Sequence, residues 1–138
     1  MTDSQSVGET VLVVENNCTA RALLADLLKR RGYKLVTAED GAAALALLVG
    51  RVNPDLILLD MLLPRVDGWA FLEAIRHSRH REVPVIVTSG IGLTDEWATD
   101  HGCVSFLHKP YDGVELFAAI GRVLKSPDAR RGSRVISP

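Results

Sequence analysis

The sequence predicts an α/β domain, a doubly wound five-stranded parallel sheet with helices on both faces. Short apolar runs without a polar face alternate with longer segments of helical periodicity along most of the chain. Strands that are apolar on both sides are typical of parallel sheets covered by helices. Connections between such strands are right-handed crossovers, which place helices on both faces of the sheet.

Five segments are expected to form the strands. Three of them are compact and rich in branched apolar side chains, whereas the second and the fifth are weaker. In chain order they are Val11–Val14, Leu35–Val36, Leu56–Leu59, Val85–Val87 and Val104–Leu107. A segment of helical character follows each of them, so strand and helix alternate five times.

Leucine spacing predicts the first helix. Its apolar stripe consists of Leu23, Leu24, Leu27 and Leu28. Its basic side chains are expected to point outward; they are Arg21, Lys29 and Arg30. Gly32 follows the last turn, where a glycine commonly ends a helix.

Capping residues and apolar spacing place four further helices. In chain order they are Ala42–Val49, ended by Gly50; about Gly68 to His77, capped by Asp67; a short helix at about Asp95 to His101, opened by Thr94 or Asp95; and a fifth that Asp112 caps and that reaches Leu124. The basic run Arg76–Arg81 is expected to be a solvated helix end, not a metal or nucleic-acid site. Trp69 and Trp97 are expected to be half-buried packing residues.

Composition and charge limit what the chain can be. Its 138 residues, 47% apolar and 24% charged, suffice for one domain of average composition. A net charge of −1 does not indicate nucleic-acid or membrane binding, and no apolar run approaches the roughly 18 residues of a membrane span. Cys18 and Cys103 lie in unrelated segments, as expected of reduced thiols in the cytoplasm. We expect one domain at residues 9–125 between disordered tails at 1–8 and 126–138.

Polar residues stand where the predicted strands end. Glu15 and Asn16 follow the first strand, Asp60 ends the third, Ser89 ends the fourth, and Lys109 follows the fifth. In an open parallel sheet, ligands bind outside the carboxyl ends of the strands. Two carboxylates, a hydroxyl and a lysine are therefore predicted to meet in one site at this edge.

Four motifs at these strand ends carry a family resemblance. They read Val11-Leu-Val-Val-Glu15-Asn16, Pro54-Asp-Leu-Ile-Leu-Leu-Asp60-Met-Leu-Leu-Pro64-Arg-Val-Asp67-Gly68, Val83-Pro-Val-Ile-Val-Thr-Ser89-Gly90 and Phe106-Leu-His-Lys109-Pro110. Over about Glu9 to Lys125, the chain resembles the receiver domain of two-component response regulators. The resemblance implies a flavodoxin-like fold of receiver type. It also implies a cytoplasmic, single-domain phosphoacceptor switch that works by protein–protein contact or as a phosphorelay intermediate.

The resemblance further implies the acceptor and a metal site. Asp60 is expected to attack the phosphorus of a phosphohistidine on a sensor histidine kinase or a histidine phosphotransfer protein. Mg²⁺ is expected to be held by Glu15, Asn16, Asp60 and the backbone carbonyl of Leu62, because this hard cation prefers oxygen ligands. The ion offsets the charge of phosphate oxygens that approach a carboxylate.

Other residues are implied around the phosphoryl group. Lys109, its direction set by a cis bond to Pro110, supplies a fixed positive charge, and Ser89 donates a hydrogen bond to a phosphoryl oxygen. Ser89 is also part of the implied switch, in which the ring of Phe106 swings inward when the hydroxyl moves to the phosphate.

The resemblance implies no chemistry beyond the phosphorylation and dephosphorylation of the chain itself. Hydrolysis requires a water placed in line behind the phosphorus, and the two positions that tune its rate in the family, Leu62 and Ile91, are apolar here. The phosphorylated form is therefore expected to be long-lived. Its output is expected to be a downstream protein, without direct nucleic-acid binding or membrane insertion.

Departures from the family pattern leave alternatives open. Asn16 replaces the second of two acids, which is expected to lower Mg²⁺ affinity by between about fivefold and several hundredfold. Asn16 thus favours a pseudo-receiver, a binding module that no longer uses phosphate, whereas intact Asp60, Ser89 and Lys109 oppose it. A flavodoxin-like cofactor enzyme would need a loop that cradles phosphate, and Glu15-Asn-Asn-Cys-Thr19 would repel phosphate instead. The segment between Ser89 and Lys109 is also shorter than usual, so its fourth helix has room for only two turns.

Overall fold

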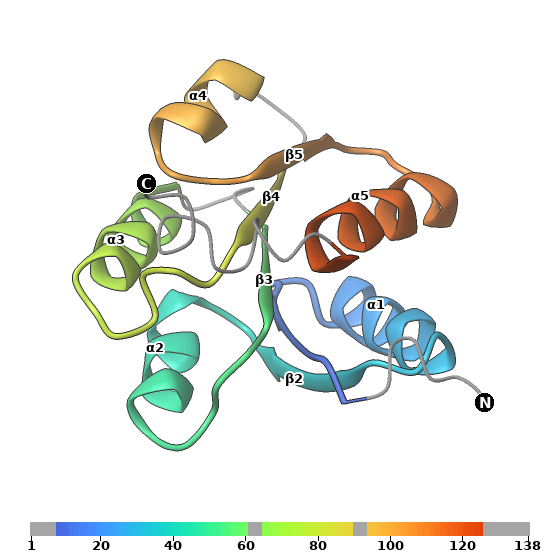
Figure 1. Ribbon diagram of the computed structural model, residues 1–138, viewed down its shortest axis with the longest axis horizontal. Coiled ribbons are helices and arrows are strands. Elements are labelled where there is room, and N and C mark those ends of the chain that lie inside the picture. The colour runs from blue at the N-terminus through green and yellow to red at the C-terminus, as the bar shows by residue number, and fades with distance from the viewer. Residues whose placement is uncertain (1–7, 61–64, 90–93, 126–138) are drawn as a thin grey trace.

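The computed structural model describes residues 8–60, 65–89 and 94–125, in which five strands alternate with five helices (Figure 1). The strands are β1 (Thr10–Val14), β2 (Lys34–Ala38), β3 (Leu56–Asp60), β4 (Val85–Ser89) and β5 (Ser105–His108). The helices are α1 (Cys18–Arg30), α2 (Gly41–Val49), α3 (Arg65–Arg76), α4 (Asp95–Asp100) and α5 (Gly113–Lys125). All strands pair in parallel in the order β2-β1-β3-β4-β5, which confirms the predicted sheet.

Different helices cover the two faces of the sheet: α1 and α5 lie on one face, and α2, α3 and α4 lie on the other (Figure 1). Val11 and Val13 of β1 pack with α1 and α5, whereas Leu12 and Val14 pack with α2 and α3. Because both sides of β1 are buried, the strand has no polar face. In the part of the chain that the structure describes, no helix is both long and apolar enough to cross a membrane.

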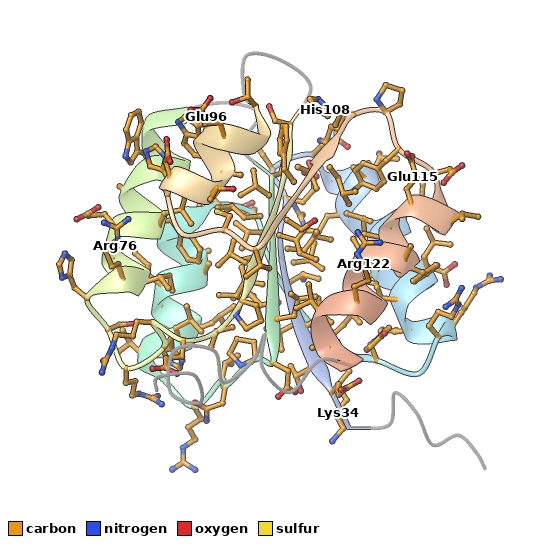
Figure 2. The ribbon with its side chains drawn as sticks, turned by 45° about the horizontal axis from the view of Figure 1, so that its top comes forward. Lys34, Arg76, Glu96, His108, Glu115 and Arg122 are labelled. Carbon is orange, nitrogen blue, oxygen red and sulfur yellow. The ribbon has the colours of Figure 1, made fainter. Side chains whose placement is uncertain are left out.

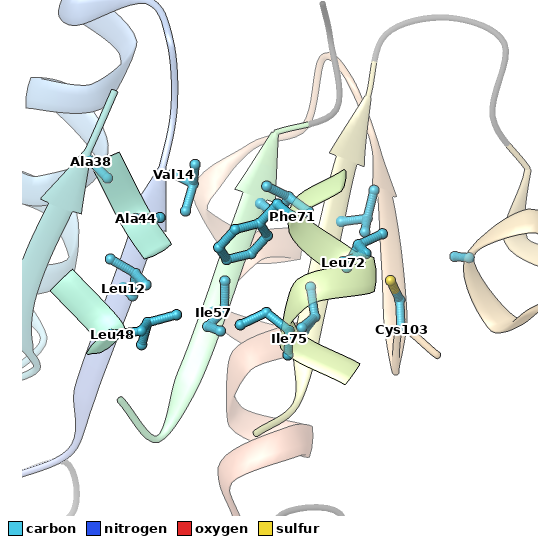
Figure 3. Close-up of a cluster of buried hydrophobic side chains, with 14 residues drawn as sticks. Leu12, Val14, Ala38, Ala44, Leu48, Ile57, Phe71, Leu72, Ile75 and Cys103 are labelled. Atoms are coloured by element: carbon cyan, nitrogen blue, oxygen red, sulfur yellow. The ribbon is translucent and has the colours of Figure 1, made fainter. Parts of the chain in front are cut away.

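The core under α2 and α3 is built on aromatic and branched side chains (Figure 3). Phe71 and Ile57 are fully buried in it, and Cys103 lies at its edge. Burial raises the pKa of the Cys103 thiol to about 12. Cys18 is exposed at the start of α1, and both cysteines are free thiols, as predicted.

The predicted caps of α4 and α5 are confirmed. Thr94 is the N-cap of α4, and its hydroxyl accepts a hydrogen bond from the N–H of Trp97 at 3.0 Å. Asp112 and Glu115 form a reciprocal capping box, in which each carboxylate accepts a hydrogen bond from the other residue's N–H. The short fourth helix is confirmed as well, since α4 has six residues.

Two predictions about helices are wrong. Helix α3 begins at Arg65, so Asp67 is its third residue and not its N-cap. Acids are favoured in the first turn as well as at the cap, and the sequence pattern therefore does not separate the two positions. In α1, Leu24 and Leu28 are buried but Leu23 is 60% exposed, because the four leucines span more of the helix circumference than the sheet covers.

The basic run at the end of α3 is a solvated helix end, as predicted, in its exposed residues Arg76, His77, Arg79 and Arg81, but not at His80. His80 is buried, and its Nε2 donates to Leu48 O at 3.1 Å. Arg79 donates to the carbonyls of Leu48 and Gly50, both at 3.3 Å, and to Asn53 Oδ1 at 2.9 Å. The two side chains close the C-terminal end of α2, where the last carbonyls lack partners within the helix and carry the negative end of its dipole.

The two tryptophans join α3 to α4, as expected of packing residues. Trp97 is half-buried and Trp69 is 46% exposed. Their rings meet edge to face with centroids 6.1 Å apart, and the ring of His101 stacks on Trp97 at 4.0 Å.

Candidate functional site

A lysine and two acids meet at the carboxyl edge of the sheet. Lys109 Nζ lies 3.2 Å from Asp60 Oδ1 and 3.6 Å from Glu15 Oε1. Both acidic side chains are only 3% exposed, whereas the lysine side chain is 27% exposed. These three residues stand at the carboxyl ends of three separate strands, β1, β3 and β5, and they form the centre of the predicted site.

Parallel pairing brings the two acids together. Val14 of β1 lies opposite Leu59 of β3, so the next residues, Glu15 and Asp60, reach the same edge side by side. The order of the sheet places β3 beside β1, although β2 lies between them in the sequence. The sequence pattern alone predicted the shared edge, and the strand order explains why these two carboxylates are neighbours.

The ends of β4 and β5 complete the edge. Ser89 is buried at the end of β4 opposite His108, and the Lys109 N–H donates to Ser89 O at 2.9 Å. The peptide bond between Lys109 and Pro110 is cis, as predicted. Figure 2 shows His108 at this end of the molecule and Lys34, the first residue of β2, at the other.

Glu15 occupies an unfavourable environment for a charged carboxylate. Burial is the main cause that raises the pKa of its carboxyl above the ordinary 4.5, and the charge of Asp60 adds to the shift. The Asn17 N–H, which donates to Glu15 Oε2 at 3.1 Å, and the charge of Lys109 lower the pKa but do not cancel the shift. Two buried carboxylates beside one ammonium leave an excess of negative charge that a further cation would relieve.

Tyr111 belongs to the surroundings of the site, and the sequence analysis missed it. Burial, followed by the charges of Glu15 and Asp60, raises the pKa of its phenol to about 12. Tyr111 also lines a groove of about 530 Å³ between α1 and the segment that joins β5 to α5. Leucines of α1 line the other side of this groove, whose inner end reaches Glu15 and Lys109. The sequence feature that could have identified Tyr111 is its place two residues after Lys109.

Two more residues, at the start of α1, hold the turn between β1 and α1, and neither was predicted to belong to the site. Asn17 is the N-cap of α1, and its Oδ1 accepts from the N–H of Ala20 at 2.8 Å. Arg21 was predicted to point outward, which is wrong. Its side chain is half-buried and turns back to donate to the carbonyls of Glu15 at 2.8 Å and Asn16 at 3.4 Å. An asparagine before an apolar helix is a capping signal, but no periodicity identifies an arginine that bonds to backbone.

The remaining predicted site residues differ in how far the structure describes them. Phe106 is half-buried and packs against the core under α3, with its ring edge-on to His108 at 4.4 Å. Asn16 is exposed at the start of the turn. Leu62 and Ile91 lie outside the described residues, so the carbonyl ligand and the phosphoryl lifetime that depend on them stay predictions.

The donor set at this edge suits Mg²⁺. No cluster of three His, Cys, Asp or Glu side chains that could hold a metal occurs in residues 8–60, 65–89 and 94–125. Glu15 and Asp60 nevertheless offer two carboxylates, and Asn16 adds an amide oxygen at the same strand end. An all-oxygen set with few protein ligands is typical of Mg²⁺, which keeps several of its waters. A cation bound there would offset the charge of Asp60, which raises the pKa of Glu15.

Comparison with known proteins agrees with the geometry. The chain matches the response regulator receiver domain family over residues 11–121. It is 31% identical over 121 residues to the DNA-binding dual master transcriptional regulator RpaA of Synechocystis, an alignment that covers 86% of this chain and 50% of RpaA. The chain spans about half the length of RpaA and of other curated relatives that it matches.

Solved structures of signalling proteins also resemble this chain. The receiver domain of a sensor histidine kinase from Pseudomonas aeruginosa, with a magnesium ion coordinated in its active site cleft, superposes with a TM-score of 0.76 at 29% identity, covering 87% of this chain and 100% of that domain. Chemotaxis protein CheY4 of Vibrio cholerae gives a TM-score of 0.74 at 25% identity, covering 83% of this chain and 98% of CheY4. The chain therefore belongs to the receiver domains of two-component response regulators, a family of flavodoxin-like signalling switches that bind Mg²⁺ in the active site.

Proposed function

We propose that this chain is a phosphoacceptor switch of a two-component or phosphorelay system, phosphorylated on Asp60 by a phosphohistidine donor. The observation that carries the proposal is the Lys109 ammonium, 3.2 Å from the carboxylate that ends the central strand β3. Phosphoryl transfer depends mainly on positioning and on charge stabilisation, and a fixed cation beside the acceptor provides both.

Asp60 is the nucleophile of the proposed reaction. A carboxylate oxygen forms a bond to phosphorus while the phosphorus–nitrogen bond of the phosphohistidine breaks, and the released ring nitrogen takes up a proton from solvent. Lys109 then holds one phosphoryl oxygen and the Ser89 hydroxyl donates to another. Glu15, Asn16 and Asp60 are the described residues that would hold Mg²⁺, which supplies positive charge to the phosphoryl oxygens when bound.

The groove beside the site is the proposed docking surface for the phosphodonor. It lies between α1 and the segment after β5, and its inner end reaches two of the site residues, Glu15 and Lys109. Leu23 lines it and is 60% exposed, so a partner with an apolar surface would cover a side chain that is otherwise in water. A sensor histidine kinase or a histidine phosphotransfer protein that docks there would bring its histidine to the acceptor.

The proposed output follows from the residues on the other side of the acceptor. When the Ser89 hydroxyl binds the phosphoryl group, the space that it leaves at the end of β4 admits the ring of Phe106. Phe106 is only half-buried, so inward movement would take its ring out of contact with solvent. A downstream protein that recognises the surface around β5 would then distinguish the two forms, without direct nucleic-acid contact by this chain.

Asn16 supports a second candidate, a pseudo-receiver that binds a partner without using phosphate. With an amide in place of a carboxylate, the site holds one formal negative charge fewer, and Mg²⁺ binding is expected to be weaker. The pairing of Lys109 with both acids favours the phosphoacceptor.

Mass spectrometry after incubation with acetyl phosphate and Mg²⁺ tests the proposal. The wild-type chain is expected to gain one phosphoryl group, Asp60→Asn is expected to gain none, and both are expected to show the same folded circular dichroism. Asp26→Asn, which changes an exposed acid on α1, is the matched control and is expected to label as the wild type does. Full labelling of Asp60→Asn would place the acceptor elsewhere, and an unlabelled wild type would favour the pseudo-receiver.

A further inference from the structure

We infer that Arg21 is a positioning residue of this site, which fixes the turn between β1 and α1 so that Glu15 and Asn16 present their side chains to Mg²⁺. The inference rests on the proposed function, because it concerns how the phosphorylation site holds its cation. Arg21 acts through the backbone, since its guanidinium donates to carbonyl oxygens of the turn.

Hydrogen bonds fix Glu15 on three sides. Its N–H donates to Ala38 O at 3.0 Å, its carbonyl accepts from Arg21 Nη1 at 2.8 Å, and its Oε2 accepts from the Asn17 N–H at 3.1 Å. The other carboxylate oxygen, Oε1, is left directed toward Lys109 at 3.6 Å. Of these three hydrogen bonds, the one from Arg21 is the bond that a side-chain substitution outside Glu15 removes without altering the backbone.

The same guanidinium nitrogen also controls Asn16. Arg21 Nη1 lies 3.4 Å from Asn16 O as well as 2.8 Å from Glu15 O, so one donor reaches two successive carbonyls. These two contacts fix the peptide units on either side of the Asn16 Cα, and the orientation of those units sets the direction in which the Asn16 side chain leaves the chain. Both side-chain ligands of the β1 end therefore depend on one guanidinium.

Helix stability does not account for an arginine at this position. Arg21 is the fourth residue of α1, near the positive end of the helix dipole, where a cation is unfavourable by about 0.3–1 kcal/mol. The other basic residues of α1, Lys29 and Arg30, lie in its last turn, where cations are favourable. The hydrogen bonds from Arg21 to the carbonyls of Glu15 and Asn16 are the interaction that compensates for this unfavourable position.

Positioning and simple charge predict opposite effects of removing Arg21. If the guanidinium acts only as a nearby positive charge, its removal lowers the repulsion of a cation and Mg²⁺ binds more tightly. If it fixes the turn, its removal frees Glu15 and Asn16 and Mg²⁺ binds more weakly. Residues that orient metal ligands typically change metal affinity by about 10–100-fold when they are substituted. We expect a loss of about tenfold, since backbone bonds of the strand end remain.

Calorimetric titration of magnesium chloride into the full, unphosphorylated chain is the test. The proteins compared are the wild type, Arg21→Met, Arg21→Lys and the control Arg30→Met, which removes an exposed guanidinium paired with Asp26 at 3.0 Å at the other end of α1. Arg21→Met is expected to bind Mg²⁺ about tenfold more weakly, and Arg21→Lys to lose less, because an ammonium keeps the charge but reaches one carbonyl. Arg30→Met is expected to match the wild type. Acetyl phosphate labelling of Arg21→Met is expected to recover at saturating Mg²⁺.

Each other outcome overturns the inference. Affinity of Arg21→Met equal to or tighter than wild type means that the guanidinium does not position the turn, and a labelling defect that persists at saturating Mg²⁺ means that it does not act through the metal ligands. If Arg21→Met does not fold, wild-type affinity in Arg21→Lys overturns the inference instead. Failure of the proposed function is seen separately, because it appears as a wild-type chain that is not labelled at Asp60.

Discussion

The two ends of this molecule both place cations against oxygen atoms, but with opposite consequences. At the carboxyl edge of the sheet, Lys109 lies beside two buried carboxylates, and burial and Asp60 still raise the pKa of Glu15. At the C-terminal end of α2, Arg79 and His80 donate to the carbonyls of Leu48 and Gly50 and to a side-chain amide oxygen. At the carboxyl edge, the carboxylate of Glu15 remains in an unfavourable environment. At the end of α2, the guanidinium of Arg79 and the ring of His80 donate to neutral acceptors.

The difference separates interactions that stabilise the fold from interactions that prepare a site. Neutral carbonyls at a helix end need donors, and the side chains that supply them stabilise the chain. Two buried carboxylates beside one ammonium carry a net negative charge. This charge lowers the stability of the fold, and binding of a further cation would offset it. Mutations that change charge should therefore have opposite effects at the two ends.

The largest expected effect is a gain in metal affinity at the carboxyl edge. We expect Asn16→Asp to tighten Mg²⁺ binding by between about fivefold and several hundredfold, because it restores a carboxylate beside Glu15 and Asp60. The same substitution should lower the stability of the metal-free chain, since it adds negative charge near two buried acids. Calorimetric Mg²⁺ titration and urea unfolding without metal measure the two effects.

Asn53→Asp is the matched control, with the same chemical change at the other end. Asn53 Oδ1 already accepts from Arg79 at 2.9 Å, so a carboxylate there would face a cation. We expect no change in Mg²⁺ affinity and a change in the free energy of unfolding within about 0.5 kcal/mol, as is usual for an exposed pair. The comparison between the two ends fails if Asn16→Asp and Asn53→Asp behave alike in both measurements.

A smaller effect is expected at the end of α2. His80→Ala should lower the free energy of unfolding by about 2 kcal/mol, because it removes a buried ring and leaves the Leu48 carbonyl with one donor fewer. Mg²⁺ affinity, measured on the folded protein, should equal that of the wild type. Replacement of His77, an exposed histidine of the same run, is the control and should change stability little. Equal stability of the two variants would show that His80 does not support α2.

The sequence predicted the fold well because the strands are buried on both faces. Five apolar runs, each followed by a helical segment, permit few arrangements other than a doubly wound parallel sheet. The boundary of α3 was wrong because an acid such as Asp67 fits both a cap and a first turn. The role of Arg79 and His80 could not be predicted, since their acceptors are carbonyls of another helix.

The centre of the site could also be predicted, whereas its surroundings could not. Glu15, Asp60 and Lys109 stand at strand ends, and the carboxyl ends of parallel strands share one edge. Arg21 and Tyr111 reach that edge from helix and loop positions, through contacts that depend on the path of the backbone. Periodicity reports which face of a helix is apolar, but it does not report a side chain that turns back to bond a carbonyl.

The smallest expected effect is a gain in stability on removing the charge of Glu15. Glu15→Gln keeps the shape of the side chain but not its charge, so the cost of holding a charged carboxylate beside Asp60 in a buried site is lost. We expect the metal-free variant to be more stable than the wild type by about 1 kcal/mol at pH 7, the scale of a typical single stabilising change. We also expect it to bind Mg²⁺ more weakly, because a carboxylate that we propose as a ligand becomes an amide.

The pH dependence of this gain identifies its cause. The pKa of Glu15 is raised in the folded chain, so the folded form holds its proton more tightly than the unfolded form does. The stability from this group is fully present below the unfolded pKa, near 4.5, and is lost as the pH rises through the raised folded pKa. The difference in free energy of unfolding between Glu15→Gln and the wild type should therefore be smallest in acid and grow through that window, as measured by urea unfolding across pH. A difference that is independent of pH would assign the gain in stability to packing. The carboxyl edge would then contain no unfavourable charge, and its contrast with the end of α2 would fail.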